Sequence, residues 1–301
     1  MRVRALFLAL AVARAVPASG QDAPVPGEWA RYRLEGPAPW RYARAVEGAG
    51  YRIVLSSPDG KALEARVEVS AAPLTADAPL PPAPPTLSAD ARAALAEPLA
   101  DDPDLDALSE RLLARAKTTL EAVELVVAFT AHRIRYAPPD GMQETASGTL
   151  RSRRGSCVGR SLLAAELLLR AGVPARQVTG VLAAERAREL TPESRVLFDA
   201  DLGGVRHRWI EVFVPGLGWV PSDPSGLANT VTARHLALSR QPPAGFRVDI
   251  AARSAELKRP VLETAGGGLT LYRPRGASVV QAVEGAPLDP RALAVPAPVR
   301  R

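Results

Sequence analysis

The stretch at residues 155–176 decides the fold, and it runs GSCVGRSLLAAELLLRAGVPAR. Its apolar residues recur at helical spacing and Ser156 is a good N-cap residue, so the pattern predicts a helix over residues 157–170. Gly172 and Pro174 are typical of a helix end. Cys157, the only cysteine among 301 residues, falls in the first turn, where the helix dipole and unpaired backbone N–H groups stabilise a thiolate. A reactive thiol is therefore expected, with a small core-facing residue as the alternative.

The chain holds 3 histidines that could activate this thiol. His132 falls near the end of a predicted helix and His235 in a short polar region, so each is expected to be a surface or structural residue. His207 differs because it opens the alternating stretch HRWIEVFV, which is typical of a β-strand. An imidazole on such a strand can face a packed helix. His207 is thus the predicted base.

Asp223 is the predicted partner of His207. It follows a second short strand, which the turn sequence PGLG at residues 215–218 joins to the first. Its carboxylate is expected to accept the Nδ1–H of the imidazole and so to fix the tautomer. A four-residue loop would pair residue 214 with 219 and put Asp223 on the wrong side of the strand, so a one-residue shift or a bulge near Pro221 is expected. Alternatively, an Asp before a proline is commonly only a turn residue.

The N-terminus has the pattern of an export signal. Arg2 and Arg4 precede an apolar run at residues 5–13, and the small residues 18–20 offer a cleavage site. The run is too short for a permanent membrane span. A short amphipathic helix is the alternative. The expected location is therefore exported, either periplasmic or extracellular.

The remaining pattern divides the chain into five expected parts. A stretch rich in proline and alanine follows an alternating β-region and is expected to act as a linker or a strap over the surface. The predicted parts are a signal peptide at 1–20, an N-terminal β-region at 21–70, the linker at 71–87, a catalytic domain at 88–240, and a C-terminal β-extension with a mobile tail at 241–301.

Within these parts, helices, strands and one loop are expected from periodicity and turn residues. Helices are predicted at 89–99, 105–116, 120–132 and 157–170, strands at 51–55, 62–69, 175–183, 207–214, 218–220, 246–250, 269–272 and 278–283, and a polar loop at 140–155.

Composition narrows the class of partner. Hydrophobic residues make up 47% and charged residues 23% of the chain, as in ordinary globular proteins. The net charge of +6 could suggest nucleic acid, but the arginines alternate with acids and aromatic residues are scarce, unlike a basic stacking face. No nucleic-acid partner and no stable membrane span are therefore expected.

These segments in order resemble the transglutaminase-like superfamily, over roughly residues 88–228. The resemblance is carried by HRIRY at 132–136, by the Cys157 helix ending LRAGVPAR at 169–176, by H-x-W-x-E-x-F at 207–213, and by PGLGWVP-x-DP at 215–224. It implies an α+β fold with a papain-like core, in which a nucleophile at a helix N-terminus packs on an antiparallel sheet. Arg208 and the residues 158–161 depart from the commonest family pattern.

The same resemblance implies the roles of the site residues. Cys157 corresponds to the nucleophile, His207 to its base and Asp223 to its orienting acid. Trp209 and Trp219 are candidate substrate-binding walls, with filling of the sheet–helix interface as the alternative. No cofactor or metal is expected.

The implied reaction is acyl transfer on an amide bond of a protein or peptide substrate, through a thioester. Water as the second nucleophile makes the protein a cysteine peptidase or amidase, which is the expected activity. A lysine amine instead makes it a transglutaminase that cross-links proteins. A catalytically silent binding module is the third reading, with an ordinary thiol at Cys157.

Overall fold

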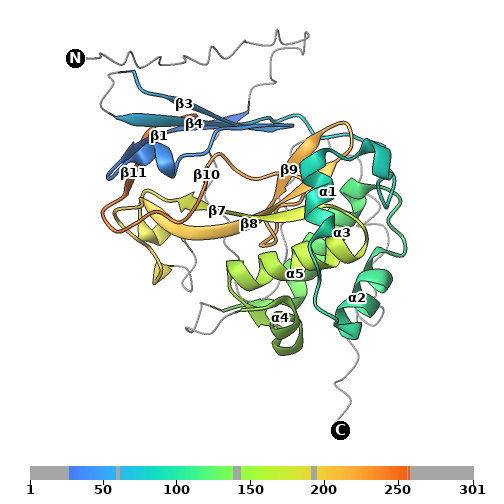
Figure 1. Ribbon diagram of the computed structural model, residues 1–301. Helices are drawn as coiled ribbons and strands as arrows, with labels where there is room; N and C mark the ends of the chain where they lie inside the picture. The colour runs from blue at the N-terminus through green and yellow to red at the C-terminus, as the bar shows by residue number, and fades with distance from the viewer. Residues whose placement is uncertain (1–26, 59–61, 138–143, 191–194, 256, 258–301) are drawn as a thin grey trace, which may run out of the picture.

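The computed structural model describes residues 27–58, 62–137, 144–190, 195–255 and 257. These residues form three layers (Figure 1): an N-terminal β-sheet, a central β-sheet and a group of helices on the other side of the central sheet. The fold is α+β, as expected. The predicted signal peptide at 1–20 and the strands at 269–272 and 278–283 lie outside the described residues.

The helices begin where the sequence places capping side chains. Ser88, Asp102, Thr118 and Ser156 each accept a backbone N–H of the first turn of the helix that follows. The predicted helices are confirmed, with boundaries that differ by a few residues. They are α1 (Ala89–Ala96), α2 (Pro103–Leu113), α3 (Thr119–Arg133) and α5 (Cys157–Arg170).

One α-helix among the described residues was not expected. The predicted polar loop at 140–155 is wrong over α4 (Ala146–Ser152), which Thr145 caps by accepting the N–H of Gly148. Periodicity is weak in seven mostly polar and small residues, and burial of Ala146, Thr149 and Leu150 stabilises the turn instead. Short strands β5 (Arg135–Tyr136) and β6 (Arg154–Gly155) pair in parallel on either side of this segment.

The central sheet is antiparallel and has the order β10-β7-β8-β9. The strands predicted at 175–183, 207–214 and 218–220 are confirmed as β7 (Ala175–Ala183), β8 (Gly204–Val214) and β9 (Gly218–Ser222), because their alternating residues bury apolar side chains between layers. β10 (His235–Leu238) was not predicted, and the short polar region expected around His235 is a buried strand instead.

The N-terminal sheet has the order β11-β1-β4-β3-β2. The strands predicted at 51–55 and 62–69 are present as the antiparallel pair β3 and β4, and the strand expected at 246–250 is found as β11, which pairs with β1. The parts predicted at 21–70 and 241–301 thus contribute to one sheet, and their separation as domains stays a prediction. The strands are β1 (Glu28–Glu35), β2 (Val46–Gly48), β3 (Tyr51–Ser56), β4 (Leu63–Val69) and β11 (Arg247–Arg253).

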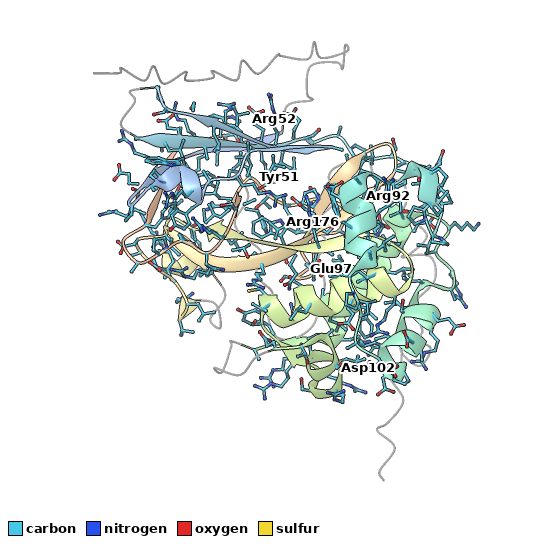
Figure 2. All side chains as sticks on the ribbon, viewed as in Figure 1. Tyr51, Arg52, Arg92, Glu97, Asp102 and Arg176 are labelled. Carbon is cyan, nitrogen blue, oxygen red and sulfur yellow. The ribbon has the colours of Figure 1, made fainter. Side chains whose placement is uncertain are left out.

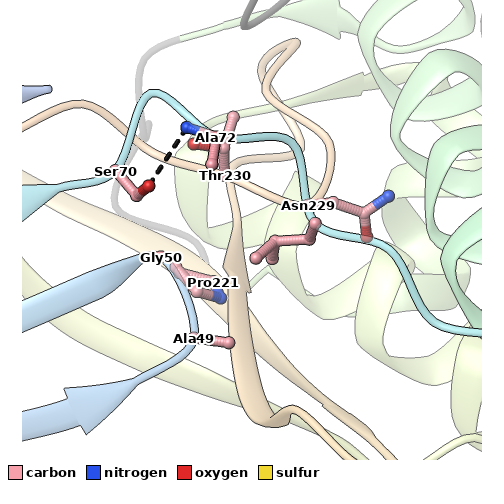
Figure 3. A pocket seen from close by; sticks show the side chains of 8 residues that line it. Ala49, Gly50, Ser70, Ala72, Pro221, Asn229 and Thr230 are labelled. Atoms are coloured by element: carbon pink, nitrogen blue, oxygen red, sulfur yellow. Dashed lines mark hydrogen bonds between the residues drawn. The ribbon is translucent and has the colours of Figure 1, made fainter. Parts of the chain in front are cut away.

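The segment at 71–87 lies on the surface as a strap. It hydrogen-bonds to the start of α3, where Leu80 N donates to the Lys117 carbonyl and Thr119 N donates to the Ala78 carbonyl. Ala78 is buried against Val214 of β8. Where the strap leaves the N-terminal sheet, Ser70 Oγ accepts the N–H of Ala72 at 3.0 Å (Figure 3). A small hollow opens there, lined by Ala49, Gly50, Ser70, Ala72, Leu74, Pro221, Asn229 and Thr230 (Figure 3).

Two apolar clusters hold the layers together. One combines side chains of the N-terminal sheet with Trp209, Val178 and Leu236 of the central sheet. The other packs the leucines of α5 against Ile210 and Val212. Trp209 has 0% exposure, and its ring lies over Gly180 on β7, where a Cβ atom would be only 2.4 Å from the indole.

Replacement of Gly180 by alanine tests this close packing. The added Cβ would meet the Leu236 carbonyl oxygen at 2.3 Å as well as the indole, so we expect Gly180→Ala to lower the free energy of unfolding by about 2–3 kcal/mol in urea titrations. Gly216→Ala is the control, because Gly216 has φ +85° but no atom within 4 Å of the position that a Cβ would take, and it should cost only about 1 kcal/mol. Equal losses in the two variants would contradict the packing argument.

Candidate active site

Cys157 is the first residue of α5, as predicted. Ser156 has the extended backbone of an N-cap, and its Oγ accepts the N–H of Val158 at 3.1 Å. The thiol is partly buried. It lies at the positive end of a fourteen-residue helix, a position that favours a negatively charged sulfur.

Glu144, which is not part of α5, holds the N-cap residue of this helix by two hydrogen bonds. The backbone N–H of Ser156 donates to Glu144 Oε1 at 2.6 Å, and the Ser156 hydroxyl donates to Oε2. Gly159 makes room for the carboxylate, because a Cβ there would lie 2.6 Å from Glu144 Oε1. Sequence reasoning missed Glu144, which belongs to the segment predicted as a loop.

A second contact fixes α5 to the strand that carries the histidine. Ser161 Oγ donates to the Arg208 carbonyl oxygen at 3.0 Å, directly beside His207. The Arg208 guanidinium donates to Gln177 Oε1 at 3.0 Å, and Gln177 Nε2 donates to the Val158 carbonyl at 3.5 Å. The residues that depart from the commonest family pattern therefore join the nucleophile helix to β7 and β8.

His207 is buried beside both groups that a catalytic base requires. Its Nε2 lies 2.8 Å from Asp223 Oδ2, and the Cys157 side chain is near enough to help raise the pKa of the ring. The expectation that Asp223 would hold Nδ1–H is wrong. Asp223 occupies the Nε2 side of the ring, so Nδ1 is the nitrogen left for the thiol.

The hairpin register explains why Asp223 reaches His207. The ladder pairs Val214 with Gly218 and Ile210 with Ser222, without a break. The loop therefore spans residues 215–217, one residue fewer than expected. The ladder ends at the pair Ile210–Ser222, and strand alternation puts the next residue, Asp223, on the side of His207. The predicted irregularity near Pro221 is wrong, because the shorter loop supplies the one-residue shift.

His235 completes the surroundings of Asp223, and sequence reasoning did not assign it there. It is 1% exposed, and its Nε2 lies 3.2 Å from the same Asp223 Oδ2 that His207 contacts. Asp223 Oδ1 accepts the N–H of Ser225 at 2.9 Å. His132, by contrast, is exposed at the end of α3, as expected.

The protonation of these groups follows from their mutual contacts. Burial by itself disfavours a charged imidazole, but the charge and hydrogen bond of Asp223, with a contribution from Cys157, outweigh it and raise the pKa of His207 to about 10. Burial likewise disfavours a charged carboxylate, yet His207 and His235 hold the pKa of Asp223 far below its usual range. Burial lowers the pKa of His235, although Asp223 acts in the opposite direction.

The two tryptophans have different surroundings. Trp209 stacks against His207 with ring centroids 6.0 Å apart and meets His235 edge-on at 5.3 Å. Because Trp209 is fully buried, it supports the histidines and presents no free face to a substrate. Trp219 is partly buried, lies 3.8 Å below the Arg176 guanidinium and donates its indole N–H to Asp90. A substrate contact by Trp219 stays a prediction, whereas the contact predicted for Trp209 does not fit its full burial.

Glu211 serves as an ion-pair partner on β8. Its Oε2 lies 2.7 Å from Arg44 Nη2 and 2.8 Å from Arg176 Nη2. Arg44 precedes β2 and Arg176 belongs to β7. This buried carboxylate therefore links the two sheets.

The two buried histidines and Asp223 also have the composition of a cation site. Among the described residues, ligand atoms of His207, Asp223 and His235 lie within 4.8 Å of one another. However, Nε2 of His207 and Nε2 of His235 lie 2.8 Å and 3.2 Å from Asp223 Oδ2. A carboxylate oxygen can only accept, so both nitrogens carry hydrogens, whereas a metal ligand needs a lone pair on that atom. The donor set fits a hydrogen-bonded cluster better than a metal centre.

Comparison with known proteins agrees with this architecture. Residues 106–224 match the model of the Transglutaminase-like superfamily, so the chain contains a transglutaminase-like core. His207 and Asp223 fall inside the matched segment and His235 outside it. No curated protein matches the sequence significantly.

Several solved structures are similar in fold. A candidate cysteine protease from Cytophaga hutchinsonii is 15% identical with a TM-score of 0.44, over 82% of this chain and 93% of that one. The periplasmic domain of TgpA from Pseudomonas aeruginosa is 19% identical with a TM-score of 0.43, over 71% and 76%. Red sea bream transglutaminase is 11% identical with a TM-score of 0.33, over 72% and 48%. At such values the chemistry has to be inferred from the site itself.

The His207–Asp223 pair should be visible in the pH dependence of stability. His207 has a folded pKa of about 10 against an ordinary 6.5, so its contribution is complete below pH 6.5 and is lost as the pH rises towards 10. We expect the free energy of unfolding of the wild type to fall by ~1–3 kcal/mol more than that of His207→Gln between pH 7 and 9.5.

Urea titrations across this pH range measure that difference. His132→Gln is the matched control, because His132 is exposed and its removal should leave the slope of the wild type unchanged. Parallel slopes for the wild type and His207→Gln would contradict a proton held by the buried pair.

Proposed function

We propose that this protein is a cysteine-dependent enzyme that transfers acyl groups from amide bonds, with water as the usual acceptor. The observation that carries the proposal is one constellation: a thiol at the N-terminus of α5, in contact with a buried imidazole that Asp223 holds from its other side. In this reading Cys157 is the nucleophile, His207 the acid and base, and Asp223 the orienting carboxylate.

The first half-reaction forms a thioester. The Cys157 thiolate attacks the amide carbonyl carbon and forms a C–S bond. The His207 imidazolium then gives its proton to the leaving nitrogen as the C–N bond breaks, so the amine departs neutral. Asp223 stabilises the imidazolium and keeps its ring in place between the two partners.

The second half-reaction regenerates the enzyme. Neutral His207 removes a proton from water, the resulting oxygen nucleophile attacks the thioester, and the C–S bond breaks to release a carboxylic acid and the thiolate. The backbone N–H of Cys157 is the proposed donor to the transient oxyanion, because the first residues of a helix have no acceptor within it. Gln143, a further candidate donor, lies outside the described residues.

Solvent access supports hydrolysis over amine transfer. Cys157 is partly exposed, whereas a transglutaminase has to keep water from its thioester. Neither tryptophan is placed by its contacts as a cover for the thiol: Trp209 packs behind His207, and Trp219 packs against Arg176 and Phe213. Water can therefore reach the thioester as readily as a lysine amine.

Export is part of the proposal. The basic and apolar pattern of residues 1–20 favours removal of a signal peptide and action on proteins or peptides in the periplasm or outside the cell. Within the described ranges, no helix is both long and apolar enough to cross a membrane. The division into a β-region at 21–70, a strap at 71–87, a catalytic domain at 88–240 and a C-terminal extension at 241–301 belongs to the same proposal.

Alkylation of Cys157 by iodoacetamide tests the activated thiol. The chain has a single cysteine, so any alkylated thiol is that of Cys157. We expect the wild type to react well below the pH of about 8.5 at which an ordinary thiol ionises, and His207→Ala to react at least ~10-fold more slowly at pH 6.5, with its curve returning to about 8.5.

His132→Ala controls for loss of an exposed histidine, and Cys157→Ser should not react at all. A wild-type curve centred near that of an ordinary thiol, and unchanged in His207→Ala, would indicate the silent binding module.

A mass-resolved assay separates hydrolysis from transfer. Glutamine-containing peptides and denatured protein are incubated with the enzyme, with and without a primary amine. We expect peptide fragments whose masses add up to that of the substrate plus one water, or glutamine converted to glutamate with release of ammonia. Little amine should be incorporated, and Cys157→Ser should form none of these products. Incorporation of the amine that outpaces hydrolysis would contradict the proposed acceptor and favour the transglutaminase reading.

A further inference from the structure

His235 lies beyond the segment that matches the family model, which ends at residue 224. It is the first residue of β10, an edge strand that pairs His235 with Leu182 of β7. This placement brings its ring to the side of the sheet that carries His207, and the two ring centroids are 5.6 Å apart.

His235 and His207 share one carboxylate oxygen. Asp223 Oδ2 lies 2.8 Å from His207 Nε2 and 3.2 Å from His235 Nε2, while Oδ1 accepts the Ser225 N–H at 2.9 Å. All three side chains of this cluster are at most 2% exposed. The carboxylate is therefore held at both oxygens, and His235 shares one of them with the candidate base.

The direction of the His235 hydrogen bond follows from its partner. A carboxylate oxygen can only accept, so His235 Nε2, which lies 3.2 Å from Asp223 Oδ2, bears the hydrogen that it donates to Asp223. The other ring nitrogen, Nδ1, lies 3.2 Å from the Thr232 backbone nitrogen, 3.0 Å from its hydroxyl oxygen and 3.3 Å from its carbonyl oxygen. Burial, which lowers the pKa of His235, keeps the ring neutral, so it supplies a donor without adding a second positive charge.

The N-terminal sheet holds this donor in place. Tyr51 Oη donates to the His235 carbonyl oxygen at 2.5 Å, and Tyr32 Oη donates to the Ala233 carbonyl oxygen at 2.7 Å. Tyr51 projects from the N-terminal sheet towards the central sheet (Figure 2). The edge of Trp209 packs against the His235 ring. The imidazole is thus fixed by a layer that lies outside the family-matched core.

We propose that His235 is a positioning residue, which donates Nε2–H to Asp223 Oδ2 and thereby fixes the carboxylate that orients His207. The proposal rests on the function proposed above. A carboxylate with a single imidazole partner can turn about its Cβ–Cγ bond, whereas donors on both oxygens restrict it. A restricted carboxylate stabilises the imidazolium, and with it the thiolate, more effectively.

Two substitutions separate the hydrogen bond from the ring. His235→Gln keeps an N–H donor near the position of Nε2, whereas His235→Phe keeps a ring against Trp209 and removes the donor. The readout is the pH dependence of Cys157 alkylation, together with hydrolysis of a denatured protein. The titratable groups that face His207 are Cys157 from α5, Asp223 after β9 and His235 from β10.

We expect His235→Phe to move the acid limb of the alkylation curve up by ~0.5–1 pH unit and to slow alkylation and hydrolysis at pH 6.5 about tenfold. His235→Gln should stay within about twofold of the wild type, since a hydrogen-bond donor rather than a ring is what Asp223 requires. Urea titrations of both variants verify that they are folded.

The relative rates of the two variants test whether His235 acts through its hydrogen bond. If His235→Gln is as slow as His235→Phe, or if the acid limb of His235→Phe coincides with that of the wild type, His235 only fills space and the proposal is overturned. An ordinary thiol curve already in the wild type is a different result, because it removes the proposed function and not merely this residue's role.

Discussion

The buried carboxylate of Asp223 is the group on which the site depends. A charge with 1% exposure is costly unless hydrogen bonds surround it, and here two imidazole N–H groups and the backbone N–H of Ser225 do so. The same contacts explain the raised pKa of His207, so that its ring is an imidazolium near neutral pH beside the thiol. Stability and chemistry therefore rely on one set of hydrogen bonds, and the carboxylate cannot be neutralised without affecting both.

Each partner in this set arrives on a different element, so the sheet register decides the geometry. The short loop after β8 places Asp223 on the His207 side. The pairing of β10 with β7 brings in His235, and the Ser161–Arg208 hydrogen bond sets α5 beside β8. A shift of one residue in any strand would turn a side chain to the opposite face. The register of the antiparallel sheet thus fixes the positions of the site residues relative to one another.

The layers outside the central sheet stabilise that register. Tyr32 and Tyr51 of the N-terminal sheet hold the backbone at residues 233 and 235, and β11 closes the same sheet from the far end of the described chain. Glu211 joins Arg44 to Arg176 across the two sheets. On the other side, the strap over α3 and the leucines of α5 cover the remaining face. The core that the family model matches is therefore only part of what positions the candidate site.

Sequence alone determined the features that depend on near neighbours. The N-cap at Ser156, the helix behind Cys157, the strands of β7 and β8, and Cys157, His207 and Asp223 as candidates all follow from periodicity, caps and the order of motifs. Tertiary structure decided the loop length before Gly218, the use of Nε2 rather than Nδ1, the α4 helix with Glu144, and the place of His235. These depend on contacts between residues far apart in the chain, such as Tyr51 with His235, and no local periodicity encodes which distant side chain will share a buried carboxylate.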